Sequence, residues 1–250
     1  MIYPHFKIEH LVGKPVQTYS GMDHPDRVVR KNSTHNAMGI DRRRHFEEFP
    51  HKISYEYNSR GFRDVEWPED IQNTPVIFGD SFIVGIGQPV EHRTSNLLGA
   101  VNVAMDGASN DWLARRGSEY IRMIRPLRAA VQWSYVSRRE DADVTGNDLS
   151  RRRPHFEVED MQDHIDNLVK NVKIIEAEAV ENGTDLVHSF IPGYTGQPMS
   201  GDYRTMLQIQ PLVRKLCDYQ EILDYARDAH HYGEQTARGY AEEIQRLWQN

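Results

Sequence analysis

Short apolar runs alternate with helical patterns through most of this chain of 250 residues. From about residue 74 onward, each apolar run is followed by a segment in which apolar side chains recur at helical spacing. Since strands that alternate with helices of about ten or more residues are joined by right-handed crossovers, we expect a mostly parallel central sheet. The predicted strands are Val76–Phe78, Ala100–Ala104, Ala129–Val136 and Asp185–Ile191.

The clearest helix lies in the second half of the chain. Its apolar residues recur at alternating steps of three and four, which is the pattern of a helix with one buried face. Asn182-Gly183 supplies its stop signal. The apolar positions are Val158, Met161, Ile165, Leu168, Val172, Ile175 and Ala179. Further helices are expected at Thr94–Leu98, Asp111–Ile124 and Tyr203–Leu216, and the last helix runs to about Trp248.

The first 54 residues have little periodicity and contain many histidines and arginines. They predict an extended arm or irregular cap, with a short strand at His51–Tyr57. We therefore divide the chain into an N-terminal arm, residues 1–54, and one α/β domain, residues 55–250. The length is ordinary for a single α/β domain with additions.

Composition excludes some functions. A formal charge of -7 argues against general nucleic-acid binding. The clusters Arg42–Arg44 and Arg151–Arg153 are expected to be solvated loop faces. The single cysteine, Cys217, cannot form an intrachain disulfide and is expected to be a buried structural thiol. No segment has the apolar length of a signal peptide or a membrane span, so a cytoplasmic location is the default expectation.

A candidate nucleophile follows the first predicted strand. The apolar run Val76–Phe78 breaks at Gly79, and Asp80, Ser81 and Phe82 come next. In open α/β sheets, ligands bind at the carboxyl ends of the strands, so Ser81 is placed at a functional edge. Gly-Asp-Ser is also a common turn sequence, and a serine is a poor nucleophile without a base. The glycines here match no nucleotide-binding loop, and we expect no cofactor.

A candidate base lies near the carboxyl terminus, where Asp228 precedes His231 by three residues. One tight turn could hold the Asp228 carboxylate against one imidazole nitrogen and leave the other nitrogen facing Ser81, as in a catalytic triad. The alternative is that Asp228 caps the helix that starts near Gly233, with His230 and His231 on the surface. The presence of Ser81 favours the triad.

A metal site is the rival interpretation of the histidines. The chain has 12 of them, but neither an H-E-x-x-H motif nor a zinc-binding Cys/His spacing occurs. Asp228, His230 and His231 could bind a metal opportunistically. The triad uses the same part of the chain without needing an ion, and we therefore predict no metal.

Four blocks of the sequence, in this order, resemble those of the SGNH hydrolases, also called GDSL esterases and lipases. The resemblance covers roughly residues 55 to 245 and implies a three-layer, flavodoxin-like α/β fold. It also implies Ser81 as nucleophile, His231 rather than His230 as base, and Asp228 as its partner. The blocks are Tyr57–Asp64, similar to N-S-x-G-F-R; Gly79–Phe82; Val101–Ala108, similar to N-x-G-x-x-G with Ala104 for the first glycine; and Asp228–His231, which matches D-x-x-H.

The chain departs from this family at the third block, an asparagine after the next strand that helps to bind the oxyanion. The strand Ala129–Val136 runs into Ser137–Glu140 without an asparagine. Asn147 comes about ten residues too late, and Asn110 follows the second block too closely. Loss of an oxyanion donor typically costs about 10²–10³ in rate.

Other groups must therefore hold the oxyanion. We expect the backbone N–H groups of Ser81 and Gly107 to be the main donors. Ser134 is the side chain expected to face the site if any compensates for the asparagine.

The resemblance implies a serine hydrolase that cleaves a carboxylic ester through an acyl-enzyme on Ser81. The substrate would be a small-molecule or glycan ester, and the lack of a long apolar lid-like segment favours a small acyl group, such as acetyl on a carbohydrate. Two alternatives stay open. An acyltransferase could use the same triad. A binding or structural module with impaired chemistry could dock residues 1–54 onto a partner or another copy of the chain.

Overall fold

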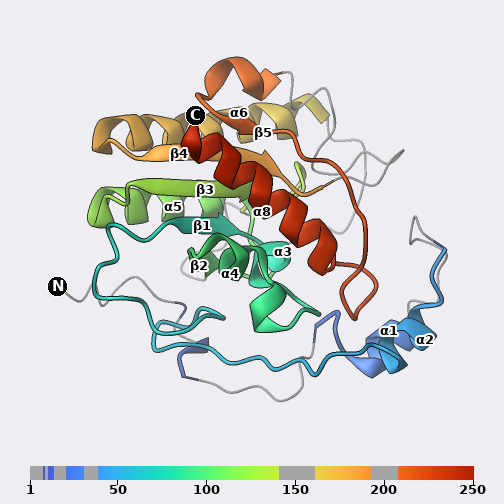
Figure 1. Ribbon diagram of the computed structural model, residues 1–250. Helices are drawn as coiled ribbons and strands as arrows, with labels where there is room; N and C mark the ends of the chain where they lie inside the picture. Colours follow the sequence, from blue (N-terminus) through green and yellow to red (C-terminus); the bar gives the residue numbers. More distant parts are fainter. Residues whose placement is uncertain (1–7, 9–10, 14–20, 31–38, 141–160, 193–207) are drawn as a thin grey trace.

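Five parallel strands form the centre of the structure, in the spatial order β2-β1-β3-β4-β5 (Figure 1). This is the flavodoxin-like order of a doubly wound sheet, so the predicted fold class is confirmed. The computed structural model describes residues 8, 11–13, 21–30, 39–140, 161–192 and 208–250. The strands are β1 (Val76–Gly79), β2 (Val101–Ala104), β3 (Arg128–Trp133), β4 (Asp185–Phe190) and β5 (Leu216–Cys217).

Helices cover both faces of the sheet because neighbouring residues of each strand point to opposite sides. Val76 and Phe78 of β1 pack in the cluster formed with α5 and α6, whereas Ile77 packs in the cluster formed with α8. Figure 1 shows α8 on one side of the sheet and α5 and α6 on the other. The helices are α3 (Ser81–Val84), α4 (Thr94–Leu98), α5 (Asn110–Ile124), α6 (Met161–Asn182) and α8 (Glu234–Gln249), with a 3-10 turn, η2, at Val90–His92.

Most predicted elements are confirmed, with shifts at their ends. The third strand is shorter than expected and stops at Trp133, because the residues after it turn to bond with α5. The helix expected at Tyr203–Leu216 is wrong from residue 210 onward. Gln208 and Ile209 are helical, but the chain then forms a 3-10 turn, η3 (Gln210–Leu212), and strand β5. Pro211 lacks the N–H that a helix needs, and Leu216 pairs with His188 of β4.

Cys217 is buried on β5, as expected for a structural thiol. Burial raises the pKa of this thiol to about 12, so it stays protonated and unreactive near neutral pH.

The described part of residues 1–54 contains two short helices, α1 (Pro25–Arg30) and α2 (Arg42–Glu47). The loop predicted at Arg42–Arg44 is therefore wrong: the Asp41 carboxylate caps a helix here through the Arg44 N–H. Arg42 is buried, whereas Arg43 and Arg44 are exposed to solvent as expected. The strand expected at His51–Tyr57 is reduced to a single bridge position at Tyr55. Arg151–Arg153 lie outside the described residues.

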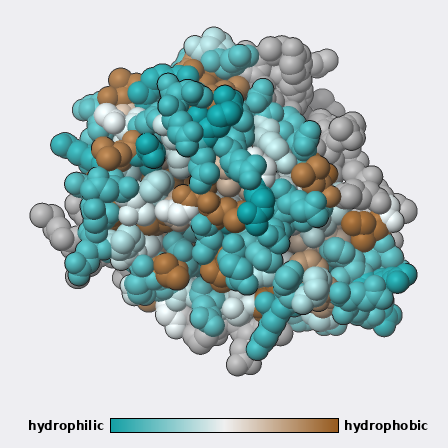
Figure 2. Space-filling view, in the orientation of Figure 1, coloured by the Kyte–Doolittle hydropathy of each residue, from teal (hydrophilic) through white to brown (hydrophobic). Residues whose placement is uncertain are grey.

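The face of the molecule in Figure 2 is mainly hydrophilic. Figure 2 shows one face of the molecule, on which hydrophobic residues gather only in small groups among hydrophilic ones. Within the described ranges, no helix is both long and apolar enough to cross a membrane.

The order of the strands predicts where a ligand would bind, at the carboxyl ends of β1 and β3. From β1 the chain moves to β2 on one side, and it then crosses back to β3 on the other. A crevice forms outside the carboxyl ends of two strands that diverge in this way. Ser81 follows β1 directly, and Ser134 follows β3, so both lie at this switch point.

Candidate active site

Ser81 is the first residue of α3, immediately after the turn that ends β1. The turn is tight because Gly79 has no side chain: a Cβ there would lie 2.3 Å from Cγ1 of Ile83. Asp80 caps the helix by accepting the Phe82 N–H on Oδ1 at 3.1 Å. Ser81 is 4% exposed and therefore sits in a largely desolvated position at the strand end.

The carboxylate of Asp80 is fully buried and is balanced by two groups from the segment after β3. Ser134 Oγ donates to Asp80 Oδ2 at 2.6 Å, and Arg138 Nη1 donates to the same oxygen at 2.8 Å. Arg138 Nη1 also donates to Ser134 Oγ at 3.0 Å. A buried carboxylate needs such partners, because an unpaired charge in the interior is costly. The residue before Ser81, the candidate nucleophile, is thereby fixed to the segment that follows the neighbouring strand.

Asn110 holds this segment in place. Its Oδ1 accepts the Ser134 N–H at 2.9 Å, and its Nδ2 donates to the Tyr135 carbonyl at 3.1 Å. The Asn110 N–H donates to the carbonyl of Arg138 at 3.2 Å. Asn110 is thus a structural residue, and sequence analysis missed both this role and that of Arg138. The available signal was the position of Arg138, a few residues after β3, the strand that pairs with β1.

The role expected of Ser134 is not the one that the structure gives it. A serine hydroxyl has one hydrogen to donate, and that of Ser134 goes to Asp80. Its side chain does lie at the switch point, but it supports the nucleophile turn rather than compensating for the missing asparagine.

Asp228 and His231 form a buried pair. Asp228 Oδ2 lies 2.6 Å from His231 Nδ1, and Asp228 Oδ1 accepts the backbone N–H groups of His230 and His231, both at 3.0 Å. Burial on its own would raise the pKa of the Asp228 carboxyl, but the charge and hydrogen bonds of His231 outweigh it and lower that pKa to about 2. Asp228 is therefore ionised and fixes the imidazole with its Nδ1 hydrogen toward the carboxylate.

The same pair sets the basicity of His231. Burial alone lowers the pKa of an imidazole, yet the Asp228 charge and hydrogen bond raise the pKa of His231 above its usual value. More distant carboxylates at Asp106 and Asp80 act in the same direction. His231 is accordingly a stronger base than a free histidine.

A tight turn produces this geometry. Ala229 adopts a left-handed conformation with φ of 50°, and its N–H donates to the Ala226 carbonyl at 2.9 Å. The Ala226 N–H in turn donates to the His231 carbonyl at 2.9 Å. Tyr225 and Tyr232 form an antiparallel bridge that closes the turn.

The helix-capping alternative for Asp228 does not hold. Helix α8 begins at Glu234 with Gly233 as its N-cap residue, and the N–H groups of Gln235 and Thr236 in its first turn donate to the Asp224 carboxylate at 3.0 Å each. Asp228 is left to His231. Among the described residues, no group of three or more potential metal ligands occurs.

The structure brings the nucleophile turn and the histidine loop together. The ring of Phe82, the residue after Ser81, meets the His231 ring edge-on with centroids 4.6 Å apart. Within the described chain, the buried Nε2 of His231 has no hydrogen-bond partner, so its bond with Ser81 is not formed in this structure. The pairing of Ser81 with His231 stays a prediction.

The two expected oxyanion donors are the first residue of α3, Ser81, and a glycine on a turn, Gly107. Ser81 is at the first position of a helix, where a backbone N–H has no partner in a preceding turn. Gly107 has a φ of 74°, which favours glycine, and the next residue closes its turn through a bond from Ala108 N–H to the Met105 carbonyl at 3.0 Å. Their joint action on one oxygen stays a prediction. Asn147 lies outside the described residues.

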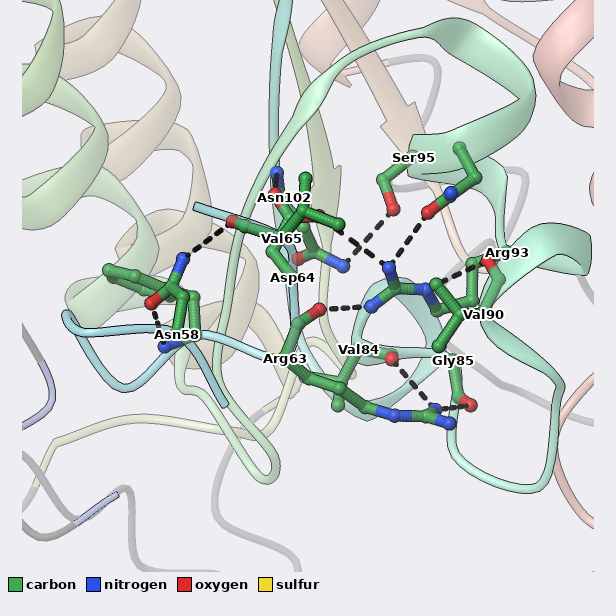
Figure 3. A network of polar contacts seen from close by, with 12 residues as sticks. Asn58, Arg63, Asp64, Val65, Val84, Gly85, Val90, Arg93, Ser95 and Asn102 are labelled. Atoms are coloured by element: carbon green, nitrogen blue, oxygen red, sulfur yellow. Dashed lines mark hydrogen bonds and ion pairs between the residues drawn. The ribbon is translucent and has the colours of Figure 1, made fainter. Parts of the chain in front are cut away.

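Two buried arginines support the end of α3 (Figure 3). Arg63 donates to the carbonyls of Val84 and Gly85, at 3.3 Å for Val84, and also to the carbonyl of Gln88 at 2.9 Å. Arg93 donates to the Arg63 carbonyl and lies 3.5 Å from the Asp64 carboxylate.

The second block joins the same support. The Asn102 N–H donates to Asp64 Oδ2 at 2.8 Å (Figure 3). Asn102 Nδ2 donates to the Ile83 carbonyl at 2.9 Å. The blocks around Arg63 and Asn102 therefore act by fixing the helix that begins at Ser81.

No protein-family model matches the sequence, and no curated protein is significantly similar to it. Among solved structures, the chain is similar to TesA, with 14% identity, coverage of 70% of this chain and 97% of that one, and a TM-score of 0.48. The chain is also similar to the psychrotrophic esterase EstA from Pseudoalteromonas sp., with 12% identity, coverage of 71% of this chain and 97% of that one, and a TM-score of 0.45. Its similarity to a GDSL-like lipase from Bacteroides thetaiotaomicron has 11% identity, coverage of 74% of this chain and 92% of that one, and a TM-score of 0.47. Likenesses at this level do not transfer an activity to this chain.

Proposed function

We propose that this chain is a serine hydrolase that cleaves a carboxylic ester through an acyl-enzyme on Ser81. The observation that carries the proposal is the buried Asp228–His231 pair, with Nδ1 bound to the carboxylate at 2.6 Å and Nε2 unpartnered among the described residues. A buried nitrogen without a partner is costly, and it is accounted for when a substrate or a nucleophile uses it. The contact of Phe82 with His231 makes the neighbouring Ser81 the candidate nucleophile.

In the proposed mechanism, His231 Nε2 takes the Ser81 hydroxyl proton as Oγ attacks the ester carbonyl carbon. Asp228 keeps the imidazole in the required tautomer and stabilises the imidazolium that forms. The tetrahedral intermediate collapses, and the leaving alcohol receives the proton from His231. Water, deprotonated by His231, then attacks the acyl carbon. The bond from this carbon to Ser81 Oγ breaks, the acid is released, and His231 returns the proton to Oγ.

The backbone N–H groups of Ser81 and Gly107 are the proposed oxyanion donors. Ser134 does not join them, because its hydroxyl hydrogen is bound to Asp80. With one donor fewer than the family it resembles, the chain is expected to be slower by up to about 10²–10³ than an enzyme with the complete set.

The proposed substrate is an ester of a small acyl group, such as an O-acetyl group on a carbohydrate. The sequence supports a small group because it has no long apolar lid-like segment. Comparison of kcat/KM for p-nitrophenyl acetate and p-nitrophenyl octanoate tests this part, and a preference for octanoate would contradict it. Release of acetate from an acetylated sugar tests the carbohydrate assignment.

Labelling with a fluorophosphonate tests the central proposal. The wild-type protein should be labelled at Ser81, and Ser81→Ala should lose both labelling and ester hydrolysis. Ser118→Ala is a matched control, because Ser118 is equally buried, at 4% exposure, and lies on α5. An unlabelled wild-type protein, or a Ser81→Ala protein with the wild-type rate, would contradict a nucleophilic Ser81.

Two alternatives have distinct outcomes. A binding module with impaired chemistry is favoured by the missing third-block asparagine and by the absence of a Ser81–His231 hydrogen bond in the described residues. It predicts no labelling, and association through residues 1–54 would then be sought by sedimentation. An acyltransferase predicts labelling together with ester synthesis when an alcohol acceptor competes with water.

A further inference from the structure

A ring of hydrogen bonds joins the N-terminal segment, the turn after Ser81 and the loop that carries His231. Tyr55 Oη donates to Asp23 Oδ2 at 2.6 Å and accepts the Gly87 N–H at 2.8 Å. The Arg227 N–H donates to the Gly87 carbonyl at 3.0 Å. The Arg227 guanidinium closes the ring with Nε and Nη2 on the two oxygens of Asp23, at 2.8 and 2.7 Å. We call Asp23 and Tyr55 the clamp.

The clamp is buried and well satisfied. Asp23 is 2% exposed and Tyr55 is 1% exposed. The Arg63 guanidinium lies over the Tyr55 ring, 4.2 Å from its centroid, so the tyrosine is also tied to the support of α3. Burial raises the pKa of Tyr55 above its usual range, which keeps its hydroxyl hydrogen in place as a donor. A bidentate arginine–carboxylate pair fixes orientation as well as distance.

The backbone approaches closely where the ring crosses the histidine loop. Gly87 has a φ of 76°, and a Cβ at this position would lie 3.0 Å from Ala226 Cβ. It would also lie 3.2 Å from the nitrogens of Arg227 and Asp228. Only glycine permits this contact without displacing the loop. The close approach therefore fixes the position of the turn after Ser81 relative to the loop before His231.

Helix α2 adds a second contact to the same loop. His45 Nε2 lies 2.9 Å from the Ala226 carbonyl oxygen, and the Arg227 guanidinium lies 4.8 Å from the centroid of the Phe46 ring. Figure 1 shows α1 and α2 near the loop that leads into α8. The N-terminal segment therefore contacts both residues that precede Asp228.

We propose that Asp23 and Tyr55 are positioning residues for the general base His231. They act through Arg227, which is adjacent to Asp228, and through the turn in which the Ala226 N–H holds the His231 carbonyl. This inference rests on the proposed function, in which His231 must meet Ser81 at hydrogen-bond distance. Displacement of a catalytic group by about 1 Å can cost on the order of 10²-fold in rate.

Asp23→Asn tests the role of the clamp in catalysis. It removes the charge that binds Arg227, and kcat for p-nitrophenyl acetate should fall by about 10-fold or more while KM changes less than about twofold. The loosened Asp228–His231 contact should also move the acid limb of the kcat/KM profile to lower pH. Glu176→Gln is the matched control: it removes another largely buried carboxylate bound to an arginine, Arg214, and it should change neither kcat nor the profile.

Amide hydrogen exchange tests the effect of the clamp on the loop with His231 independently of any esterase activity. The N–H groups of His230 and His231 are bonded to Asp228, and their exchange should accelerate in Asp23→Asn but not in Glu176→Gln. Faster exchange in a protein whose wild type has no esterase activity would support the clamp and contradict the proposed function. Wild-type exchange, kcat and pH profile in folded Asp23→Asn would overturn the clamp.

Tyr55→Phe provides a milder variant if Asp23→Asn does not fold. It removes one hydroxyl that bonds to Asp23 and Gly87 and leaves the Asp23–Arg227 pair in place. The same accelerated exchange and reduced kcat are expected, at a smaller amplitude. An active Tyr55→Phe protein with wild-type exchange in the loop would overturn the clamp.

Discussion

Two buried histidines in this protein each contact a carboxylate, and we propose a catalytic role for only one of them, His231. His188 on β4 has both nitrogens occupied: Nδ1 accepts from Trp133 Nε1 at 3.1 Å, and Nε2 lies 2.9 Å from Glu176 Oε2. His231 uses Nδ1 for Asp228, and its Nε2 has no partner in the part of the chain that the structure describes. A buried histidine–carboxylate pair is therefore not by itself a sign of catalysis.

The pKa values of the two histidines are shifted in opposite directions. Burial outweighs the attraction of Glu176 and lowers the pKa of His188, whereas Asp228 outweighs burial and raises the pKa of His231. Arg214, which also binds Glu176, weakens the pull of that carboxylate on His188. The neutral imidazole of His188 completes a structural network, whereas the raised pKa of His231 supports the role of general base that we propose for it.

Asp228→Asn should produce the largest difference between the two sites. Without the carboxylate, the His231 tautomer and the stabilisation of the imidazolium are lost, so kcat should fall on the order of 10⁴-fold. Rates of p-nitrophenyl acetate hydrolysis measure this, with Glu176→Gln as the equivalent change at His188. Equal losses in both variants would show that the two pairs are not functionally distinct.

His188→Leu should affect stability rather than catalysis. The substitution leaves Trp133 Nε1 without its acceptor and removes one partner of Glu176, which should lower the free energy of unfolding by about 2–4 kcal/mol. Urea unfolding measures the loss. At a temperature where the variant is folded, kcat should match that of the wild type, and a large loss of kcat would place His188 in the catalytic machinery.

A pH titration followed by NMR should separate the two imidazoles. The His231 midpoint should lie above 6.5, and that of His188 below 6.5. His231 then stabilises the fold fully below pH 6.5, and this contribution is lost as pH rises through its folded pKa. His188 acts with the opposite sign, since its contribution is present above pH 6.5 and is lost as pH falls below that value. Each unit between the folded and the unfolded pKa of a histidine corresponds to about 1.4 kcal/mol of stability.

The same titration has a kinetic counterpart. Because His231 must be neutral to accept the Ser81 proton, kcat/KM should decline as pH falls through a value above 6.5. An acid limb below 6.5 would contradict the strengthening of this base by Asp228.

Asn147→Ala should have the smallest effect. Asn147 follows the third predicted strand too late to occupy the position of the family's oxyanion asparagine, so kcat should change less than about threefold. A hundredfold loss at unchanged stability would show that the segment after β3 restores the third block.

The sheet and the nucleophile turn could be predicted from sequence because their signals are local. Val76–Phe78 followed by Gly79 specifies a buried strand and a tight turn, and the steps between Ile165 and Ala179 specify the helix that covers one face. The Asp228–His231 contact is also local, since it spans three residues in one turn. Strand β5 has two residues and no pattern of its own, and it exists through its pairing with β4.

The supports of the site could not be predicted in this way. Arg138 binds Asp80 across 58 positions of sequence, and Arg227 binds Asp23 across 204. Nothing in the composition around Asp23 distinguishes it from a surface carboxylate. Such partners are specified only when the sheet has set the distance between strand ends, so their roles follow from topology rather than from any motif.

The separation of 204 residues between Asp23 and Arg227 also sets an order of events during synthesis. At about 5–20 residues per second, Arg227 is made roughly 10–40 s after Asp23. Strands β1 to β5 and the turn bearing Ser81 are all translated in that interval, before the loop with His231 is complete. A nascent chain would thus carry Ser81 well before His231, and any esterase activity would begin only once the loop with His231 had left the ribosome and docked onto the segment with Asp23.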